Sequence, residues 1–114
     1  MNFNRTGRVG DLLRAEVASM ILHQEIKDPR IGFVTITNVL MSKDLKHARI
    51  FFSMLGSEKE VKDSMEGLNS ASGFVRRALA KRLRLKNIPS VRFEFDETLE
   101  YSSHIEEVLK EVKE

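Results

Sequence analysis

The sequence of 114 residues contains no cysteine. This absence excludes disulfide bridges, metal sites built on thiolates and cysteine nucleophiles, and it agrees with a reducing compartment. Long hydrophobic runs are missing as well. Charged residues such as Arg5, Arg8 and Asp11 interrupt the start of the chain, unlike a signal peptide, and no window approaches the roughly 18 apolar residues of a membrane span. We therefore expect a soluble, cytoplasmic protein.

Hydrophobic residues nevertheless make up 41% of the chain, which suffices for one core. The length is typical of a single domain. We expect that domain to occupy residues 1–100, and a short acidic tail to follow over residues 101–114.

Charge is distributed unevenly along the chain. Residues 1–93 carry 17 Lys and Arg against 9 Asp and Glu, whereas residues 94–114 carry 2 against 8. The body thus has a net charge of +8 and the end of the chain −6, although the whole chain is only +2. A cationic body favours an anionic partner, and a phosphate backbone is the obvious candidate.

The spacing of hydrophobic residues predicts the secondary structure. Apolar residues three and four apart indicate helices, and alternating runs rich in β-branched residues indicate strands. In chain order we expect a helix over 8–24, strands over 33–41 and 47–54, a helix from Ser57, a second helical segment after the junction Ala71-Ser72-Gly73, a strand over 91–96 and a tail helix over 102–112.

Local signals set the boundaries of these elements. Ser57 with Glu60 three residues later is the pattern of a capping box, and Asn87-Ile88-Pro89 is expected to close the second helical segment. The short polar connection 42–46 makes the first two strands antiparallel, whereas a helical crossover makes the third strand parallel to the second. The fold class is therefore α+β, with a mixed three-stranded sheet and helices on one face.

The segment that follows the junction is strongly basic. At helical spacing its apolar residues form one face, made of Phe74, Val75, Ala78, Leu79 and Leu85. Arg77, Lys81 and Arg84 share the opposite face. Such a stripe by itself is often only a solvated face, and it is the cationic charge of the body that favours an anionic ligand here. Arg82 falls within the apolar arc and is expected to emerge at the end of the helix.

Gly73 indicates something further about the junction. A glycine within a helix costs roughly 1 kcal/mol relative to alanine. Its presence predicts either a bend in the backbone or packing too close for a side chain.

Catalysis finds little support in the sequence. His23, His47 and His104 are scattered, without a second metal ligand at a motif spacing. Ser102 and Ser103 precede His104, but adjacent residues on a helix do not face one another. We expect no enzymatic activity, no metal and no cofactor.

Several motifs in order resemble the ribosome-binding factor A family over about residues 5 to 110. The matching segments are Arg5-x-x-Arg8-Val9, Asp28-Pro29-Arg30, Val34-Thr35-Ile36-Thr37-x-Val39, Ser42-x-Asp44-Leu45-x-x-Ala48, Ala71-Ser72-Gly73-Phe74-x-Arg76, Leu83-x-Leu85-Lys86-x-Ile88-Pro89 and Phe93-x-Phe95-Asp96.

The resemblance implies a type II KH-like fold in which an Ala-x-Gly kink replaces the glycine clamp loop of KH domains. The pair Gly7 and Gly10 imitates that clamp loop, but it stands where the first helix opens and is read as a loose helix start. The resemblance further implies a non-enzymatic factor that binds free small ribosomal subunits and assists late maturation of their RNA, including its 5′ end, above all in the cold.

On this basis we expect the kinked helix pair to contact ribosomal RNA, and the protein to be a monomer without membrane or small-molecule partners. The expected RNA contacts are Arg76, Arg77, Lys81 and Arg84, with Lys86 and Arg8 at the margins. An adaptor that binds another protein through its sheet or tail helix is the alternative.

Overall fold

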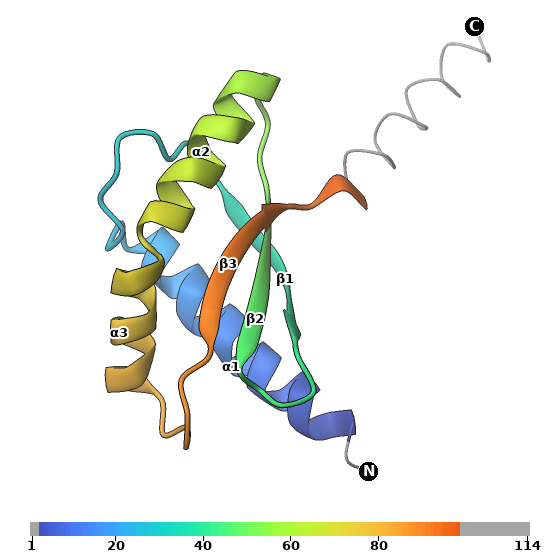
Figure 1. Cartoon of the computed structure of the whole chain (residues 1–114). Coiled ribbons are helices and arrows are strands. Elements are labelled where there is room, and N and C mark those ends of the chain that lie inside the picture. Colours follow the sequence, from blue (N-terminus) through green and yellow to red (C-terminus); the bar gives the residue numbers. More distant parts are fainter. Residues whose placement is uncertain (1–2, 99–114) are drawn as a thin grey trace, which may run out of the picture.

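The computed structural model describes residues 3–98. In chain order these residues form α1 (Phe3–Leu22), β1 (Thr35–Met41), β2 (His47–Ser53), α2 (Glu58–Ser70), α3 (Ser72–Arg82) and β3 (Ser90–Phe95), as Figure 1 shows. The predicted order of elements is confirmed over this range. The predicted tail helix over 102–112 and the Ser102-Ser103-His104 sequence lie outside the described residues.

The sheet has the strand order β1-β2-β3. β1 pairs antiparallel with β2, so that Met41 lies opposite Ala48, and β2 pairs parallel with β3, so that Phe52 lies opposite Phe95. The register of β1 shifts between Ile36 and Asn38, where a bulge interrupts the ladder. The predicted mixed three-stranded sheet is confirmed.

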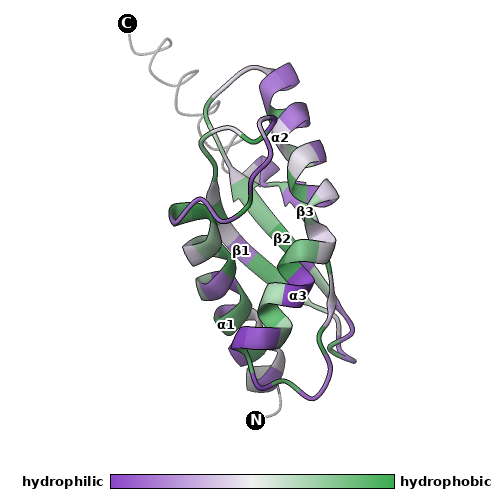
Figure 2. Ribbon diagram, turned by 90° about the vertical axis from the view of Figure 1, so that its left-hand side faces the viewer, coloured by the Kyte–Doolittle hydropathy of each residue, from purple (hydrophilic) through white to green (hydrophobic). Residues whose placement is uncertain are grey.

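One face of this sheet carries the core. The alternation of β2 turns Ala48, Ile50 and Phe52 to the same side, where all three are buried. Helix α1 packs on β1, and α2 and α3 pack on β3. Figure 2 looks onto these helices and shows β1 and β2, coloured mostly as hydrophobic, behind them. A single layer of helices therefore covers one face of the sheet.

Helix α1 is longer at its start than the sequence pattern predicted, because it begins at Phe3 rather than near Arg8. Gly7 and Gly10 consequently lie inside the helix, and reading them as a loose helix start was wrong. Gly10 is buried, and a Cβ at this position would lie 3.2 Å from the carbonyl oxygen of Val39. Gly10 thus lets α1 approach the backbone of β1 closely.

Helix α2 begins as predicted. The Ser57 hydroxyl accepts a hydrogen bond from the Glu60 amide at 3.1 Å, and the Glu60 carboxylate accepts one from the Ser57 amide at 3.0 Å, which completes the capping box. Leu68 is fully buried. Ser64 and Gly67 are buried too, although the spacing of large apolar residues gave no sign of it.

Helix α3 ends earlier than predicted. Its last residue is Arg82, and Leu83 already has extended backbone angles, φ −115° and ψ 142°. Leu85 therefore leaves the predicted apolar face, and Asn87-Ile88-Pro89 does not close a helix. Phe74, also predicted for that face, has an exposed fraction of 39%. Within residues 3–98 no helix is both long and apolar enough to cross a membrane.

Candidate nucleic-acid interface

A single residue, Ala71, separates α2 from α3. Its backbone angles are φ −89° and ψ 4°, and its amide donates to the carbonyl oxygens of Leu68 and Gly67 at 3.1 and 3.2 Å. Its own carbonyl already accepts the first hydrogen bond of α3, from the Val75 amide at 2.9 Å. The predicted bend at the junction is confirmed, and it lies at Ala71.

Gly73 does not pack closely against another part of the protein. It is exposed, and among residues 3–98 a Cβ there would meet only the Arg77 guanidinium, at 3.4 Å. Of the two alternatives for Gly73, a bend or close packing, close packing does not hold for the described residues. The first turn of α3 contains no acidic residue. The positive end of the helix dipole, at Ser72, is therefore not neutralised by a carboxylate within that turn.

The outward face of α3 carries three exposed cations, Arg76, Arg77 and Lys81. They lie opposite the buried residues of the helix, Val75, Ala78 and Leu79. The Arg76 guanidinium donates to the carbonyl oxygen of Ile88 at 3.2 Å and so ties the connection after α3 to the helix. Arg77 and Lys81 form no ion pair with any described residue, and both are available to an external anion.

The remaining predicted contact residues are arranged differently from the prediction. Arg84 was predicted to share a helical stripe with Arg77, but it is exposed beyond the end of α3. Lys86, predicted at the margin of the surface, is exposed beyond that end as well. Arg8 is exposed on α1, eight residues before Glu16, which is about 12 Å along that helix. Glu16 forms the ion pair between α1 and the end of α3, and we therefore place Arg8 outside the cluster of cations on α3.

Arg82 is neutralised within the fold. The Arg82 side chain was expected to emerge at the end of the helix without binding anything, but its guanidinium forms an ion pair with Glu25 and approaches a Glu16 oxygen at 3.9 Å. The hydrogen bond from Arg82 holds the pKa of the Glu25 carboxyl below its ordinary value. This cation therefore joins α3 to α1 and to the segment that follows α1.

The sequence pattern gave no role to Arg30, which the structure places at the junction. Asp28 accepts hydrogen bonds from the Arg30 amide, Nε and Nη2 at 2.9, 3.1 and 2.8 Å. Nη2 of Arg30 also donates to the hydroxyl of Ser70, the last residue of α2, at 3.0 Å. These bonds to Arg30 lower the pKa of Asp28 to about 2. The Asp-Pro-Arg motif was the only signal in the sequence.

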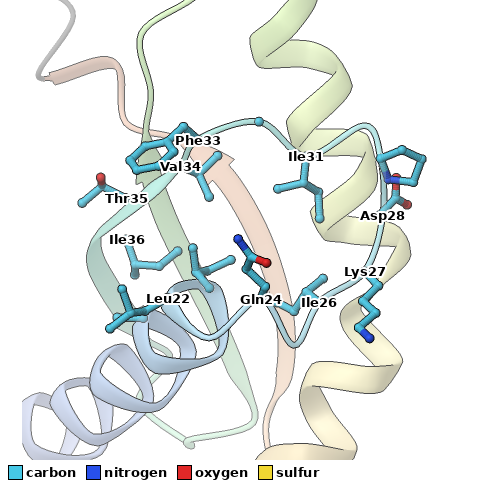
Figure 3. A pocket seen from close by; sticks show the side chains of 14 residues that line it. Leu22, Gln24, Ile26, Lys27, Asp28, Ile31, Phe33, Val34, Thr35 and Ile36 are labelled. Atoms are coloured by element: carbon cyan, nitrogen blue, oxygen red, sulfur yellow. The ribbon is translucent and has the colours of Figure 1, made fainter.

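A hollow of about 880 Å³ lies between the end of α1 and the start of β1 (Figure 3). Its lining is mostly apolar and includes Leu22 and Phe33, whose exposed fractions are 77% and 94%. A second hollow, of about 860 Å³, lies on the other side of Phe33 and includes Leu55, which is 99% exposed. This end of the molecule thus presents exposed apolar side chains that are separate from the cations of α3.

The chain matches the family model for ribosome-binding factor A over residues 5–109. A ribosome-binding factor A of Halothermothrix orenii is 45% identical over 114 residues, which are 100% of this chain and 93% of that protein. The crystal structure of ribosome-binding factor A from Thermus thermophilus is 25% identical, with a TM-score of 0.66 over 78% of this chain and 93% of that one. A homology model of Thermus thermophilus ribosome binding factor A, fitted into a cryo-electron microscopy map of a complex with the 30S subunit, is also 25% identical. Its TM-score is 0.55, over 72% of this chain and 89% of that one.

Proposed function

Because the chain belongs to the ribosome-binding factor A family and has its KH-like fold, we propose that it binds the small ribosomal subunit through ribosomal RNA. The contact surface is the α2–α3 junction with the outward face of α3. The observation that carries this proposal is the pair Arg77 and Lys81, exposed side by side on α3 without a carboxylate partner among the described residues. The similarity to the Thermus thermophilus ribosome binding factor A in the complex with the 30S subunit supports the choice of the small subunit as the partner.

The chemistry of the surface suits the RNA backbone rather than individual bases. Lysine and arginine contacts to phosphates supply affinity and register but little sequence reading, and folded RNA is recognised largely by shape. Arg76, Arg84 and Lys86 extend the cationic surface beyond Arg77 and Lys81. Bound in this way, the protein acts without catalysis: it holds immature RNA in a conformation that favours late assembly and processing of its 5′ end, most importantly in the cold.

Co-sedimentation with purified small subunits tests the proposal. The native chain is expected to sediment with free small subunits, and Arg77→Glu/Lys81→Glu to remain in the supernatant while its circular dichroism spectrum stays native. Lys43→Glu/Lys62→Glu is the matched control, because these exposed cations lie outside α3 and form no ion pair with the described residues. Equal binding by all three proteins would move the interface away from α3, and no binding by the native chain would refute the proposal.

A second candidate function is that of an adaptor for another protein. It is favoured by the exposed apolar residues around Phe33, because apolar surface of this kind commonly marks protein contacts. Ribonuclease treatment separates the two functions: an adaptor keeps its partner after the RNA is digested, whereas an RNA-binding factor releases it.

A further inference from the structure

The segment of residues 25–32, called here the bracing segment, connects α1 to β1 and touches both helices of the kinked pair. Figure 3 shows it leaving the end of α1, passing beside α2 at Asp28 and Ile31, and turning back toward β1. Its first residue, Glu25, forms an ion pair with Arg82, the last residue of α3. Arg30 donates a hydrogen bond to Ser70, the last residue of α2. One short segment thus binds the final residue of each helix.

The bracing segment is itself fixed against α2. The Ser64 hydroxyl accepts a hydrogen bond from the Gly32 amide at 2.9 Å and donates to the Arg30 carbonyl oxygen at 3.4 Å. At Gly67 a Cβ would come within 2.8 Å of the Ile31 side chain, so side chains of the bracing segment lie directly against α2 where this residue has no side chain. A third attachment lies at Ser70. Nη2 of Arg30 donates both to the Asp28 carboxylate and to the Ser70 hydroxyl at the end of α2.

Such a brace matters because the connection between α2 and α3 is so short. Ala71 is the only residue between the helices, so a change in its backbone angles would rotate the whole of α3 relative to α2. Helix α3 has 11 residues and is therefore about 16 Å long. A rotation of about 10° at Ala71 would displace the end of α3, close to Lys81, by roughly 3 Å, which is enough to break a hydrogen bond to a phosphate.

We propose that the bracing segment sets the angle between α2 and α3, so that Glu25, Asp28 and Arg30 are positioning residues for the RNA-binding surface. The inference rests on the proposed function for its consequence in binding, but the angle itself can be measured without RNA. None of the three residues needs to touch RNA. Glu25 and Asp28 carry the same sign of charge as the phosphates and could only repel them.

Because Glu25 and Asp28 are negatively charged, replacing them distinguishes the brace from a purely electrostatic effect: the two hypotheses predict opposite changes in RNA affinity. Glu25→Gln and Asp28→Asn each remove a negative charge, and a protein that bound RNA through its overall field alone would then bind more tightly. The brace predicts weaker binding instead, by about 2- to 5-fold for each variant, the range set by an exposed ion pair. Glu66→Gln is the matched control. Glu66 is exposed on α2 near the junction and, among the described residues, forms no ion pair. Its charge acts on Arg30 through space, so this control removes a negative charge beside the brace without removing one of the brace's hydrogen bonds.

The angle is measured by electron paramagnetic resonance. The chain has no cysteine, so spin labels attach only at Glu58→Cys and Ala80→Cys, two exposed positions near the outer ends of α2 and α3. The distance distribution between the labels is expected to shift or broaden in Glu25→Gln and Asp28→Asn and to stay unchanged in Glu66→Gln. Binding to small subunits is measured in parallel, on proteins whose thermal unfolding shows that they are folded at the assay temperature.

The outcomes separate the brace from the proposed function. Broadened distances with weaker binding support the brace and its positioning role. Unchanged distances in both variants overturn the brace, whatever the affinity. Broadened distances with binding equal to that of the Glu66→Gln control overturn the positioning role alone. Failure of the native chain to bind small subunits refutes the proposed function, while the distance measurement still decides whether the brace exists.

Discussion

Replacing Gly67 by alanine is expected to destabilise the protein, although alanine is the better helix former. Gly67 lies inside α2 and is buried. A Cβ there would approach Ile31 Cγ1 to 2.8 Å and both Arg30 Cβ and Asp28 Cγ to 3.3 Å. These atoms belong to side chains anchored close to the backbone, so the bracing segment would have to move away from α2 to make room.

The magnitude follows from two opposing effects. Overpacking of this kind costs about 1–3 kcal/mol, whereas exchanging glycine for alanine inside a helix returns about 1 kcal/mol. The free energy of unfolding of Gly67→Ala should therefore fall by up to about 2 kcal/mol. Gly7→Ala is the matched control, because Gly7 lies inside α1 and, apart from its chain neighbours and the backbone of α1 itself, no described atom lies within 4 Å of a Cβ there. It should gain up to about 1 kcal/mol.

Urea denaturation and thermal unfolding measure both changes, with about 4–8 °C in Tm for each kcal/mol in a domain of this size. A double-mutant cycle identifies the contact: Ile31→Ala removes the Cγ1 that the new methyl group meets. Gly67→Ala should then cost about 0.5–3 kcal/mol less in the Ile31→Ala background than alone. If Gly67→Ala stabilised the protein as Gly7→Ala does, the close approach of the bracing segment to α2 would be refuted.

Three further predictions concern other parts of the fold. The pKa of Asp28 is lowered to about 2 by Arg30. The stability that this pair contributes is therefore present above the ordinary carboxyl pKa of about 3.9 and lost as the pH falls toward 2, so urea titrations of the native chain and Asp28→Asn should converge there. Ser57→Ala removes the cap of α2 and should cost about 1 kcal/mol, seen as a drop in Tm of several degrees; an unchanged Tm would contradict the cap. Binding to small subunits should fall with salt at a log–log slope of roughly −3 to −5, for four to six phosphate contacts. Arg77→Gln should make that slope about 0.7–0.9 less steep, whereas Arg49→Gln should leave it unchanged, because Arg49 lies on β2 and is already paired with Glu94 within the fold.

Much of the fold could be read from the sequence because the signals are local. The alternation in β2, the capping box at Ser57 and the short connection between β1 and β2 each depend on residues within one element or its immediate neighbours. The bend at Ala71 was visible for the same reason, since small residues interrupt a helical pattern there. The exposed cations Arg77 and Lys81 followed from helical spacing alone.

The boundaries of the candidate site were less predictable. A basic helical pattern continues through Arg84, but the backbone leaves the helix after Arg82, where the chain turns back toward β3. Phe74 fits the apolar arc on a helical wheel, yet it is partly exposed, because the surface that α3 buries is set by the sheet beneath it and not by the pattern of its own residues.

What the sequence determined by itself is therefore the order of elements, the direction of the strands and a basic helix after a bend. The tertiary structure alone decided which cations find a partner within the fold. The sequence pattern placed Arg82 in the apolar arc and assigned it no partner, but in the structure Arg82 meets Glu25, 57 residues away in the chain, and is no longer available to an external anion. Arg30 and Gly67 likewise acquire their roles from the bracing segment and α2. Contacts between distant segments depend on how the chain folds back on itself, and the spacing of residues within one segment carries no record of them.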